Sequence, residues 1–259
     1  MTDLVFSPWF FIFWLFIFLL GALEVINAPP KAAGSRRIRW PANIGLGLIN
    51  GVIVSAIPVG AVAAAYWAQG SAIGLMNVIS VPLWVLIVTT VLVRSLAQYV
   101  FHRTMHQVPW LWHIHKVNHS DDHMDGSTGL RFHPLEALAA LVFTAMVGVI
   151  FGVDPEILAI VELIEILYGI ATHTALRVPS WLDRLMRSVL ITPDLHRVHH
   201  AADAAMYDKN FGAVLSIWDR FFGTYLTTAD AHAVPLGIGD KDERTRGDIG
   251  WLLILPFRR

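Results

Sequence analysis

The feature that most constrains this chain is a series of long apolar runs without Asp, Glu, Lys or Arg. A helix needs about 20 mostly apolar residues to cross the hydrocarbon core of a bilayer, and the first such run is Leu4–Leu23. Residues 40–93 are free of charge and long enough for two spans, which the turn signal Gln69–Ser71 divides. Two shorter apolar runs follow: residues 137–153, which are also uncharged, and residues 157–176, which contain Glu162 and Glu165. They predict two more spans, or a hairpin that stops short of a full crossing.

The composition also indicates a membrane protein. Hydrophobic residues make up 55% of the 259 residues and charged residues 15%, whereas a soluble domain carries about 25% charged residues. The net charge of -1 provides no basic field, so we expect no nucleic-acid partner. Because the chain has no cysteine, thiolate metal sites, iron–sulfur clusters and cysteine nucleophiles are excluded. We expect an all-α polytopic membrane protein with about four to five hydrophobic helices.

Lysine and arginine predict the orientation of the spans. Loops rich in these residues stay in the cytoplasm, and Lys31, Arg36, Arg37 and Arg39 directly follow the first apolar run. If that loop is cytoplasmic, five crossings bring all 19 Lys and Arg residues to the same side. We therefore expect a helical cap on the cytoplasmic face, formed by the segments that follow the third and fifth spans.

We expect a single integral membrane domain over residues 1–259, because the sequence shows no internal repeat and no low-complexity tract. Residues 1–93 would hold the N-terminal transmembrane helices. Residues 94–228 would form a histidine-rich catalytic region that includes the membrane hairpin 137–176. Residues 229–259 would form a C-terminal tail.

The second unusual feature is a set of histidines at helical spacing. His102 and His106 lie four residues apart where the third predicted span continues past the membrane, and His115 and His119 repeat this spacing. Residues four apart share one face of a helix, which brings two imidazoles to one ion. A predicted helix that begins after Thr192 carries the last members of the set: His196, His199 and His200.

Two further histidines join the set, His173 at the end of the fifth predicted span and His133 between the clusters. Their number exceeds the four ligands of a tetrahedral zinc ion, so we expect two metal ions. Imidazole suits Fe, Zn, Cu and Ni, so the residues alone do not name the metal. The candidate ligands are His102, His106, His115, His119, His133, His173, His196, His199 and His200.

Five ordered motifs surround these histidines. They are His102-Arg-x-x-His106, Trp112-x-x-His115-Lys-Val-Asn-His119-Ser, Arg131-Phe-His133-Pro-Leu-Glu136, Thr192-Pro-Asp-Leu-His196-Arg-Val-His199-His200 and Trp218-Asp-Arg-Phe-Phe-Gly223-Thr-Tyr225. Together they resemble the fatty acid hydroxylase/sterol desaturase superfamily, over about half of the chain. The resemblance implies an integral membrane enzyme with a histidine-ligated dimetal centre, for which iron is the expected metal and zinc the alternative.

The resemblance also implies the reaction, in which O2 is the cosubstrate for hydroxylation or desaturation of a lipid in the bilayer. An unactivated carbon–hydrogen bond offers no acidic proton and no electrophile, so this chemistry needs a redox metal rather than acid–base side chains. No cytochrome or flavin domain is recognisable in the chain, so we expect a separate electron donor of the ferredoxin, cytochrome or reductase type.

One position departs from the superfamily pattern. The second motif usually reads HxxHH, and Asn118 stands at the middle histidine position. An amide oxygen is a weaker ligand than imidazole, so either the site has one ligand fewer or His123 or His133 supplies it. His113 and His232 lie off the histidine-bearing faces and are expected at the surface.

Several polar residues are candidates for orienting the ligands. Glu162 and Glu165 lie within an apolar run, where a charge costs at least about 2.5 kcal/mol, so their side chains should face protein or be protonated. Caps, turns and ion pairs are the alternative explanation for these residue types. The candidates are Asn118, Glu162, Asp194, Asp208 and Asn210, and Asp219 also matches a position of the superfamily.

Two rival functions remain open. A hydrolytic or isomerising zinc enzyme on the same scaffold would activate water and would not use O2. A non-enzymatic metal or haem membrane protein, such as a transporter or an electron carrier, would need paired polar residues or histidines inside its spans. The first three predicted spans contain no Asp, Glu, Lys or Arg, so a lipid oxygenase is the leading hypothesis.

Overall fold

The computed structural model describes residues 8–27, 32–57, 60–240, 242 and 244–258. All regular elements within these residues are helices, and the β pairing there consists of two isolated bridges, Leu190 with Leu215 and Ala201 with Leu236. The protein is therefore all-α, as the apolar runs predict.

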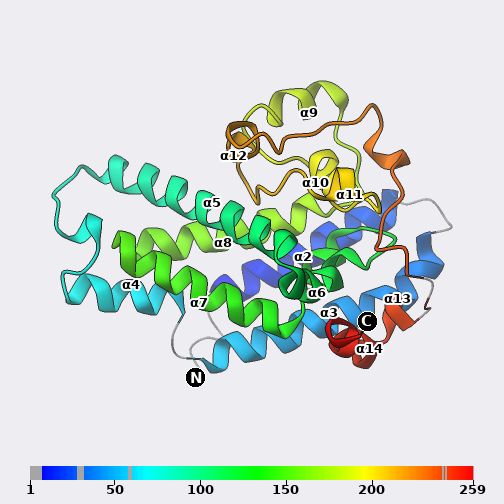
Figure 1. Cartoon of the computed structure of the whole chain (residues 1–259), viewed down its shortest axis with the longest axis horizontal. Helices are drawn as coiled ribbons and strands as arrows, with labels where there is room; N and C mark the ends of the chain where they lie inside the picture. Colours follow the sequence, from blue (N-terminus) through cyan, green and yellow to red (C-terminus); the bar gives the residue numbers. More distant parts are fainter. Residues whose placement is uncertain (1–7, 28–31, 58–59, 241, 243, 259) are drawn as a thin grey trace.

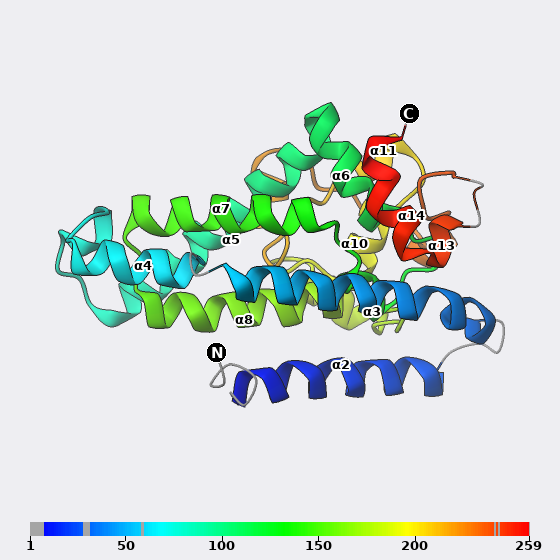
Figure 2. The same ribbon diagram turned by 90° about the horizontal axis from the view of Figure 1, so that it is seen from below.

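Long helices run side by side along the longest axis of the molecule (Figure 1). They are α2 (Pro8–Asn27), α3 (Ala32–Ala56), α5 (Leu83–Gln107), α7 (Pro134–Phe151) and α8 (Pro155–Thr172). Helix α2 forms an outer layer next to α3 and α8 (Figure 2). The short α4 (Ala61–Gly70) packs against α7 and α8 at one end of this bundle.

Three stretches of the described residues are long and apolar enough to cross a membrane: Ser35–Asn77, Leu83–Gln107 and Pro134–Phe151. Phe11–Asn27 is a shorter apolar helix. Large apolar side chains on these helices point outward, and Phe18, for example, is 70% exposed. Such a surface is unfavourable in water and suits contact with lipid. The chain is an integral membrane protein.

The turn predicted at Gln69–Ser71 is confirmed, because α4 ends at Gly70 and is capped by Ser71. The apolar residues before this turn do not form one continuous helix, since α3 ends at Ala56 and α4 begins at Ala61. After the turn, the 3-10 helix η1 (Leu75–Asn77) precedes α5. The two predicted spans therefore contain three α-helices rather than two.

The basic residues expected in a loop after the first span lie instead in the first turns of α3. Arg36 and Arg39 are buried, and Arg39 donates hydrogen bonds to Asp121 at 2.7 Å and to Asp125 at 2.6 Å. These carboxylates neutralise the guanidinium group, so the helix can include it. Lys31 and the beginning of the predicted run at Leu4 lie outside the described residues.

The predicted hairpin 137–176 consists of α7 and α8. Helix α7 begins three residues earlier than its apolar run, because His133 caps it and Pro134 occupies its first turn. Gly152 ends it in a left-handed conformation, with a φ of 63°. Asp154 then caps α8 by accepting hydrogen bonds from the amides of Glu156 and Ile157.

Shorter helices form a cap at the end of the bundle away from α4 (Figure 1). They are α6 (Pro109–His119), η2 (Gly126–Leu130), α9 (Ser180–Met186), α10 (Pro193–His199), α11 (Ala204–Tyr207), α12 (Ile217–Phe221) and η3 (Ala231–Ala233). The indole of Trp218 donates a hydrogen bond to Ser95 on α5 at 3.0 Å, and the ring of Phe222 stacks on Tyr99. These contacts fasten the cap to α5.

The end of the chain is part of the core. Helices α13 (Arg244–Gly247) and α14 (Ile249–Ile254) and the 3-10 helix η4 (Leu255–Phe257) follow one another. Leu252 and Leu255 are buried in a cluster with residues of α3 and α6, namely Ala42, Leu46 and Val117. This part of the region expected to be a tail therefore packs as a structural element, because its apolar residues have a surface to bury against.

Candidate metal centre

Local sequence signals position the first four histidines. No proline interrupts the helix before Pro109, so α5 extends to Gln107 and carries His102 and His106 on one face. Pro109 then occupies the first turn of α6, which carries His115 and His119 at the same spacing. The predicted extension of the third span and both pairs of histidines on shared faces are confirmed.

The remaining histidines come from the ends of α8 and α10. Thr192 caps α10 by accepting a hydrogen bond from the amide of Leu195, as the sequence predicts. His196 and His199 lie on this short helix, and His200 is its C-terminal cap residue. His173 is the C-terminal cap residue of α8.

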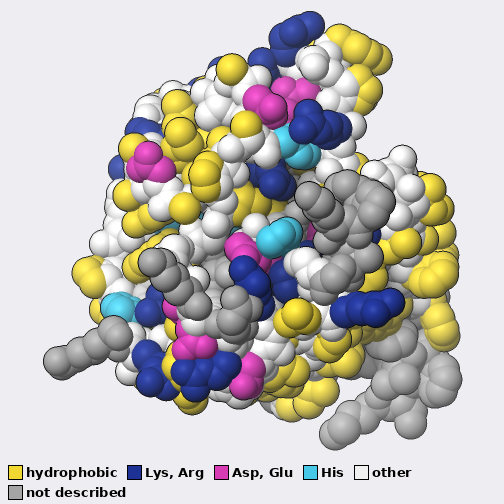
Figure 3. Space-filling model, turned by 90° about the vertical axis from the view of Figure 1, so that its right-hand side faces the viewer, with side chains coloured by type: hydrophobic (Ala, Val, Ile, Leu, Met, Phe, Trp, Pro, Cys, Tyr) yellow, Lys and Arg dark blue, Asp and Glu magenta, His cyan; other side chains and the backbone are white. Residues whose placement is uncertain are grey.

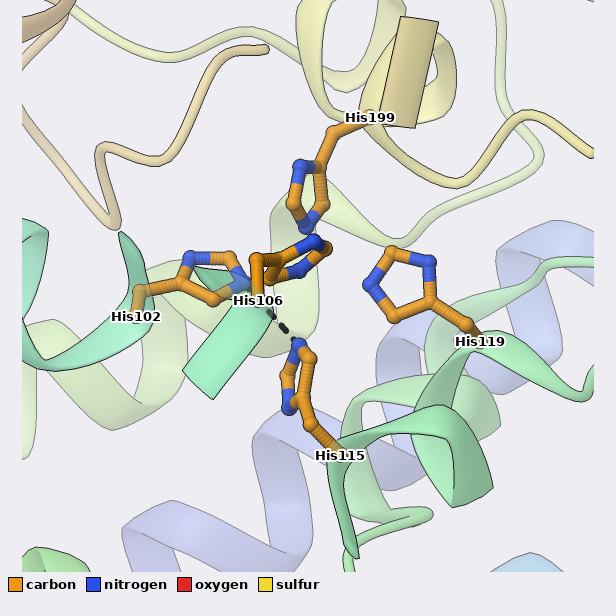
Figure 4. Close-up of side chains that lie close together, drawn as sticks. All are labelled: His102, His106, His115, His119 and His199. Carbon is orange, nitrogen blue, oxygen red and sulfur yellow. Dashed lines mark hydrogen bonds between the residues drawn. The ribbon is translucent and has the colours of Figure 1, made fainter. Parts of the chain in front are cut away.

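Eight histidines converge into two buried groups. We call them the five-histidine group, formed by His102, His106, His115, His119 and His199, and the three-histidine group, formed by His173, His196 and His200. Within each group, one ring nitrogen of every member lies within 4.8 Å of those of all the others. Figure 4 shows the five rings, which arrive from α5, α6 and α10 and point toward one another.

The distances within the groups suit shared metal ions. The Nε2 atoms of His102 and His115 lie 3.1 Å apart, and so do those of His173 and His196. Two nitrogens bound to one ion at about 2.0–2.1 Å would be separated by about 3.0–3.4 Å. The two groups are neighbours, because the rings of His119 and His200 stack with their centroids 4.3 Å apart.

Hydrogen bonds at Nδ1 direct Nε2 of several rings inward. The Nδ1 atom of His102 lies 2.9 Å from the Phe211 carbonyl, and that of His199 lies 2.7 Å from the Lys209 carbonyl. The Nδ1 atom of His173 lies 2.6 Å from the Gly169 carbonyl. An imidazole that donates from Nδ1 carries its lone pair at Nε2, so these bonds select the tautomer that can bind a metal.

Carboxylates serve the same role at two other rings. Glu136 Oε1 on α7 lies 2.7 Å from His115 Nδ1, and both side chains are buried. Asp208 Oδ1 lies 3.3 Å from His106 Nδ1, and its side chain is half exposed. The partner of His115 is thus fixed inside the protein, while that of His106 reaches in from the surface.

The ring nitrogens that face inward fit bound metal. Nitrogens without a hydrogen-bond partner are buried on His106, His119, His196, His199 and His200. Buried polar atoms are normally paired, and a metal ion supplies a partner to a nitrogen lone pair. A set of imidazoles with few carboxylates near them suits a first-row transition metal and does not suit Mg²⁺ or Ca²⁺.

Burial keeps these imidazoles neutral. It lowers the pKa of His199 to about 3, and burial together with neighbouring histidines holds the pKa values of His119, His196 and His200 well below their usual range. Because the neutral imidazole is the form that binds metal, protons do not compete with a metal for these residues near pH 7.

Four histidines lie outside both groups. His133 caps α7 through Nδ1, and its Nε2 lies 3.1 Å from the Leu253 carbonyl, so both nitrogens have partners. His123 is exposed and pairs with Asp122, and His113 contacts Lys116. Neither of the residues expected to compensate for Asn118 therefore reaches the three-histidine group.

The polar candidates mostly have other partners. Asn118 donates to the Thr128 carbonyl, and Glu162 lies 3.5 Å from Arg94 on α5. Asp194 lies 3.4 Å from His232, which is thus held against α10. Of the five candidates, only Asp208 contacts a histidine of either group.

Asn210 acts on the site through the backbone. Its side chain bonds Leu195 and Leu226, and its φ of 55° places it in the left-handed region that asparagine tolerates. The next residue, Phe211, presents its carbonyl to His102, and Asp219 fixes the Phe211 amide at 2.8 Å. Both polar residues therefore hold the loop that orients His102.

The sequence did not lead us to predict Glu136 as the hydrogen-bond partner of a candidate metal ligand. The residue was visible in the motif that begins at Arg131, and as an acid at the start of an apolar helix it was unusual. No spacing rule connects it to His115, however, because the two residues lie on different helices that meet only in the folded chain.

Comparison with known proteins identifies the family. A sequence model described as fatty acid hydroxylase matches residues 87–224, more than half of the chain. The chain belongs to the fatty acid hydroxylase family. The matched segment contains all eight histidines of the two groups, so the family region and the metal-binding geometry coincide.

Curated relatives of this fatty acid hydroxylase family member are lipid-modifying enzymes by name. An alkylglycerol monooxygenase of Danio rerio is 33% identical over 136 residues, 52% of this chain and 29% of that protein. The human alkylglycerol monooxygenase is 33% identical over 129 residues, 49% of this chain and 27% of that protein. An ornithine lipid hydroxylase of Rhizobium tropici is 25% identical over 155 residues, 60% of this chain and 46% of that protein.

The chain thus spans less than a third of the length of these alkylglycerol monooxygenases and less than half of the ornithine lipid hydroxylase. No solved structure matches the chain significantly.

Proposed function

We propose that this protein is an O2-dependent lipid hydroxylase or desaturase with a histidine-ligated diiron centre on the cytoplasmic face of a membrane. Family membership and the printed names of the relatives support an oxygenase that acts on lipids. The observation that carries the proposal is the convergence of eight histidines into two adjacent buried groups at one end of a membrane-spanning bundle.

The five-histidine group would hold one ion and the three-histidine group the other. A redox metal bound there would activate O2 for attack on an unactivated carbon–hydrogen bond. For hydroxylation the balance is one lipid C–H bond, O2, two electrons and two protons, giving one lipid alcohol and one water. Desaturation removes two hydrogens from the lipid and yields two waters from the same inputs.

The chain's own residues would prepare the centre for this reaction. The Nδ1 partners hold the rings of His102, His115 and His199 before a metal arrives, so little reorganisation is needed on binding. His199 and His200 are completely buried, and exclusion of water protects reactive species formed near them. The apolar outer surface of the bundle would bring lipid to this site from the side.

Charge supports the cytoplasmic orientation and a separate electron donor. Lys and Arg side chains lie across the cap end of the molecule together with acidic ones (Figure 3). At the opposite end, residues 60–82 and 148–157 contain no Lys or Arg. By the positive-inside rule this distribution favours a cytoplasmic cap, where a soluble or peripheral protein of the ferredoxin, cytochrome or reductase type would supply electrons.

The experiment that tests the function combines metal analysis with lipid oxidation. Full-length protein, purified without a chelator or a histidine tag, is expected to bind about two iron ions per chain and to oxidise a lipid only when O2 and an electron donor are both present. His200→Ala should remove the metal of the three-histidine group and abolish oxidation. His133→Ala, whose ring lies outside both groups, should retain both ions.

A zinc enzyme on the same scaffold is the rival that the experiment must separate. Lipid turnover that proceeds with zinc and without O2 would contradict the oxygenase proposal. Absence of bound metal after reconstitution with iron and with zinc would contradict the dimetal centre itself.

A further inference from the structure

Helix α2 carries one acidic residue near its end, Glu24, and its side chain is almost completely buried, with 1% of its surface exposed. Its Oε1 atom accepts three hydrogen bonds. They come from the amide of Gly126 at 3.0 Å, the hydroxyl of Thr174 at 2.7 Å and the amide of Ala175 at 2.8 Å. One carboxylate oxygen thus joins α2 to η2 and to the segment that follows α8.

The second carboxylate oxygen, Oε2, is buried and has no hydrogen-bond partner. Space beside it is kept open by Gly126, at which a Cβ atom would lie 3.5 Å from Oε2 and 2.9 Å from Leu20. A buried oxygen without a donor is unfavourable in a finished protein core. A ligand that donates a hydrogen bond to such an oxygen removes this cost.

Glu24 lies in the wall of a cavity of about 50 Å³, between α2 on one side and α3, η2 and α8 on the other. Its walls are mostly apolar and include Ile17, Leu20, Ile44 and Ile170. The other polar side chain in the wall, Ser127, already donates its hydroxyl to Asp125 at 2.6 Å. A buried water needs two to four polar partners. A hydroxyl on a hydrocarbon chain needs one acceptor for its hydrogen, and apolar walls suit the rest of the chain.

The cavity lies next to the three-histidine group. Thr174 and Ala175, which bond Glu24, come directly after His173 in the chain. Ile170 lines the cavity, and Gly129 packs against both Ile170 and the ring of His173, because a Cβ there would lie 3.3 Å from Nδ1 of that ring. Outward-facing apolar residues of α2, such as Phe18, place the same region in contact with lipid.

We propose that this cavity binds the hydroxyl-bearing end of the lipid substrate, and that Oε2 of Glu24 accepts a hydrogen bond from that hydroxyl. This inference rests on the proposed function and narrows it, since the substrate becomes a lipid whose hydroxyl lies close to the carbon that is oxidised. Glu24 is then a residue that determines specificity.

Glu24→Gln is the decisive variant. The amide oxygen of glutamine can keep the three hydrogen bonds of Oε1, so the contacts between α2, η2 and Thr174 remain. The amide nitrogen replaces Oε2 and turns the acceptor in the cavity into a donor. Binding is measured for two probes, an alkylglycerol and its di-O-methyl ether, by native mass spectrometry of the full chain in nanodiscs without an electron donor.

The unaltered chain is expected to bind the alkylglycerol more tightly than the ether. Glu24→Gln should reduce the preference for the alkylglycerol over the ether about tenfold, because the amide nitrogen can donate to an ether oxygen as well as to a hydroxyl oxygen. Equal affinity of the unaltered chain for both probes would overturn the proposal, as would unchanged affinities in Glu24→Gln. Tighter binding of the ether by the unaltered chain would also overturn it.

A second pair of variants tests the cavity without altering Glu24. A Cβ at Gly21 would touch only Trp40, at 3.7 Å, so Gly21→Leu can fill the cavity from α2. This variant should bind both probes more weakly. Gly51→Leu adds the same side chain to α3 at a position where a Cβ has no atom within 4 Å. This control should bind both probes as tightly as the unaltered chain. Full binding of both probes to Gly21→Leu would exclude this cavity as their site.

The binding measurement is independent of turnover, so the two proposals can fail separately. Selective binding that depends on Glu24, without lipid oxidation under any donor, would refute the oxygenase and leave the hydroxyl site. Oxidation of lipid by a Glu24→Gln variant with unchanged probe affinities would refute the hydroxyl site and leave the oxygenase.

Discussion

Glu136 is the residue whose side chain most directly orients a histidine of the candidate metal centre. His102, His173 and His199 are oriented by backbone carbonyls, which no substitution removes. His115 instead depends on a carboxylate from another helix at 2.7 Å. The orientation of this ring can therefore be tested by changing a residue that is not itself a ligand.

Glu136→Ala is expected to lower metal affinity about 10- to 100-fold, because His115 loses the partner that holds its tautomer and ring orientation. Competition with a chelator of known affinity measures the change. Glu156→Ala is the control, since Glu156 is an exposed acid at the start of α8, at the other end of the bundle. Equal metal affinity in Glu136→Ala and the unaltered chain would contradict this role.

At the scale of elements, the three-histidine group depends on close packing of η2 against α8. A Cβ at Gly129 would lie 2.9 Å from the Cα atom of Ile170, closer than packed atoms approach. The backbone of α8 cannot yield as a flexible side chain would. Glycine at this position therefore sets the distance between η2 and the helix that ends in His173.

Gly129→Ala is expected to lower the thermal unfolding midpoint and to reduce metal retention, because overpacking costs about 1–3 kcal/mol and displaces His173. Gly169→Ala is the matched control on the facing helix. A Cβ there meets no atom within 4 Å, and alanine favours a helix over glycine. If both variants unfold at the same temperature and retain equal metal, the close approach does not position His173.

A second contact between elements is the ion pair that fastens α3 to the segment before η2. Burial alone would raise the pKa of Asp121, but the guanidinium groups of Arg39 and Arg131 outweigh it and hold the pKa at about 2, below the usual 3.8. The carboxylate is therefore ionised in the folded protein at pH values well above 2.

Asp121→Asn is expected to destabilise the protein by up to about 3–5 kcal/mol at neutral pH, because buried Arg131 loses the carboxylate that balances its charge and Arg39 keeps only Asp125. The contribution of the ionised carboxylate is complete above pH 3.8 and is lost as the pH falls through about 2. The difference in unfolding midpoint between Asp121→Asn and the unaltered chain should therefore shrink in that interval. Asp122→Asn, at a partly exposed pair, should cost less than about 1 kcal/mol.

At the scale of the whole molecule, the two ends of the bundle differ in charge and in content. Both histidine groups, the cap and most of the Lys and Arg residues that the structure describes lie toward one end, while the turns around α4 and between α7 and α8 contain neither histidine nor Lys nor Arg. This asymmetry is what a fixed orientation in a membrane requires.

The orientation can be tested directly because the chain has no cysteine. A single cysteine at Ala229, an exposed cap position, should react with a membrane-impermeant maleimide only when the cytoplasmic side is accessible. A single cysteine at Ser71, exposed beside α4, should react only from the other side. Labelling of both positions from the same side would contradict the predicted topology.

Much of the architecture follows from local patterns in the sequence. Charge-free runs predicted the membrane helices, and the spacing of His102 with His106 and of His115 with His119 predicted which rings share a face. Thr192 was recognised as the residue before a helix start. These predictions succeed because helix formation and capping depend on residues within a few positions of one another.

Only the tertiary structure decided how the histidines are divided. It placed His199 with α5 and α6, and its neighbours His196 and His200 with His173. It removed His133 from the centre, because the segment around Leu253 packs against that ring. It also brought Glu136 to His115 and left Glu24 in the wall of a cavity, with one carboxylate oxygen unpaired. These outcomes depend on which distant segments meet, and the spacing of residues along one helix carries no information about its neighbours.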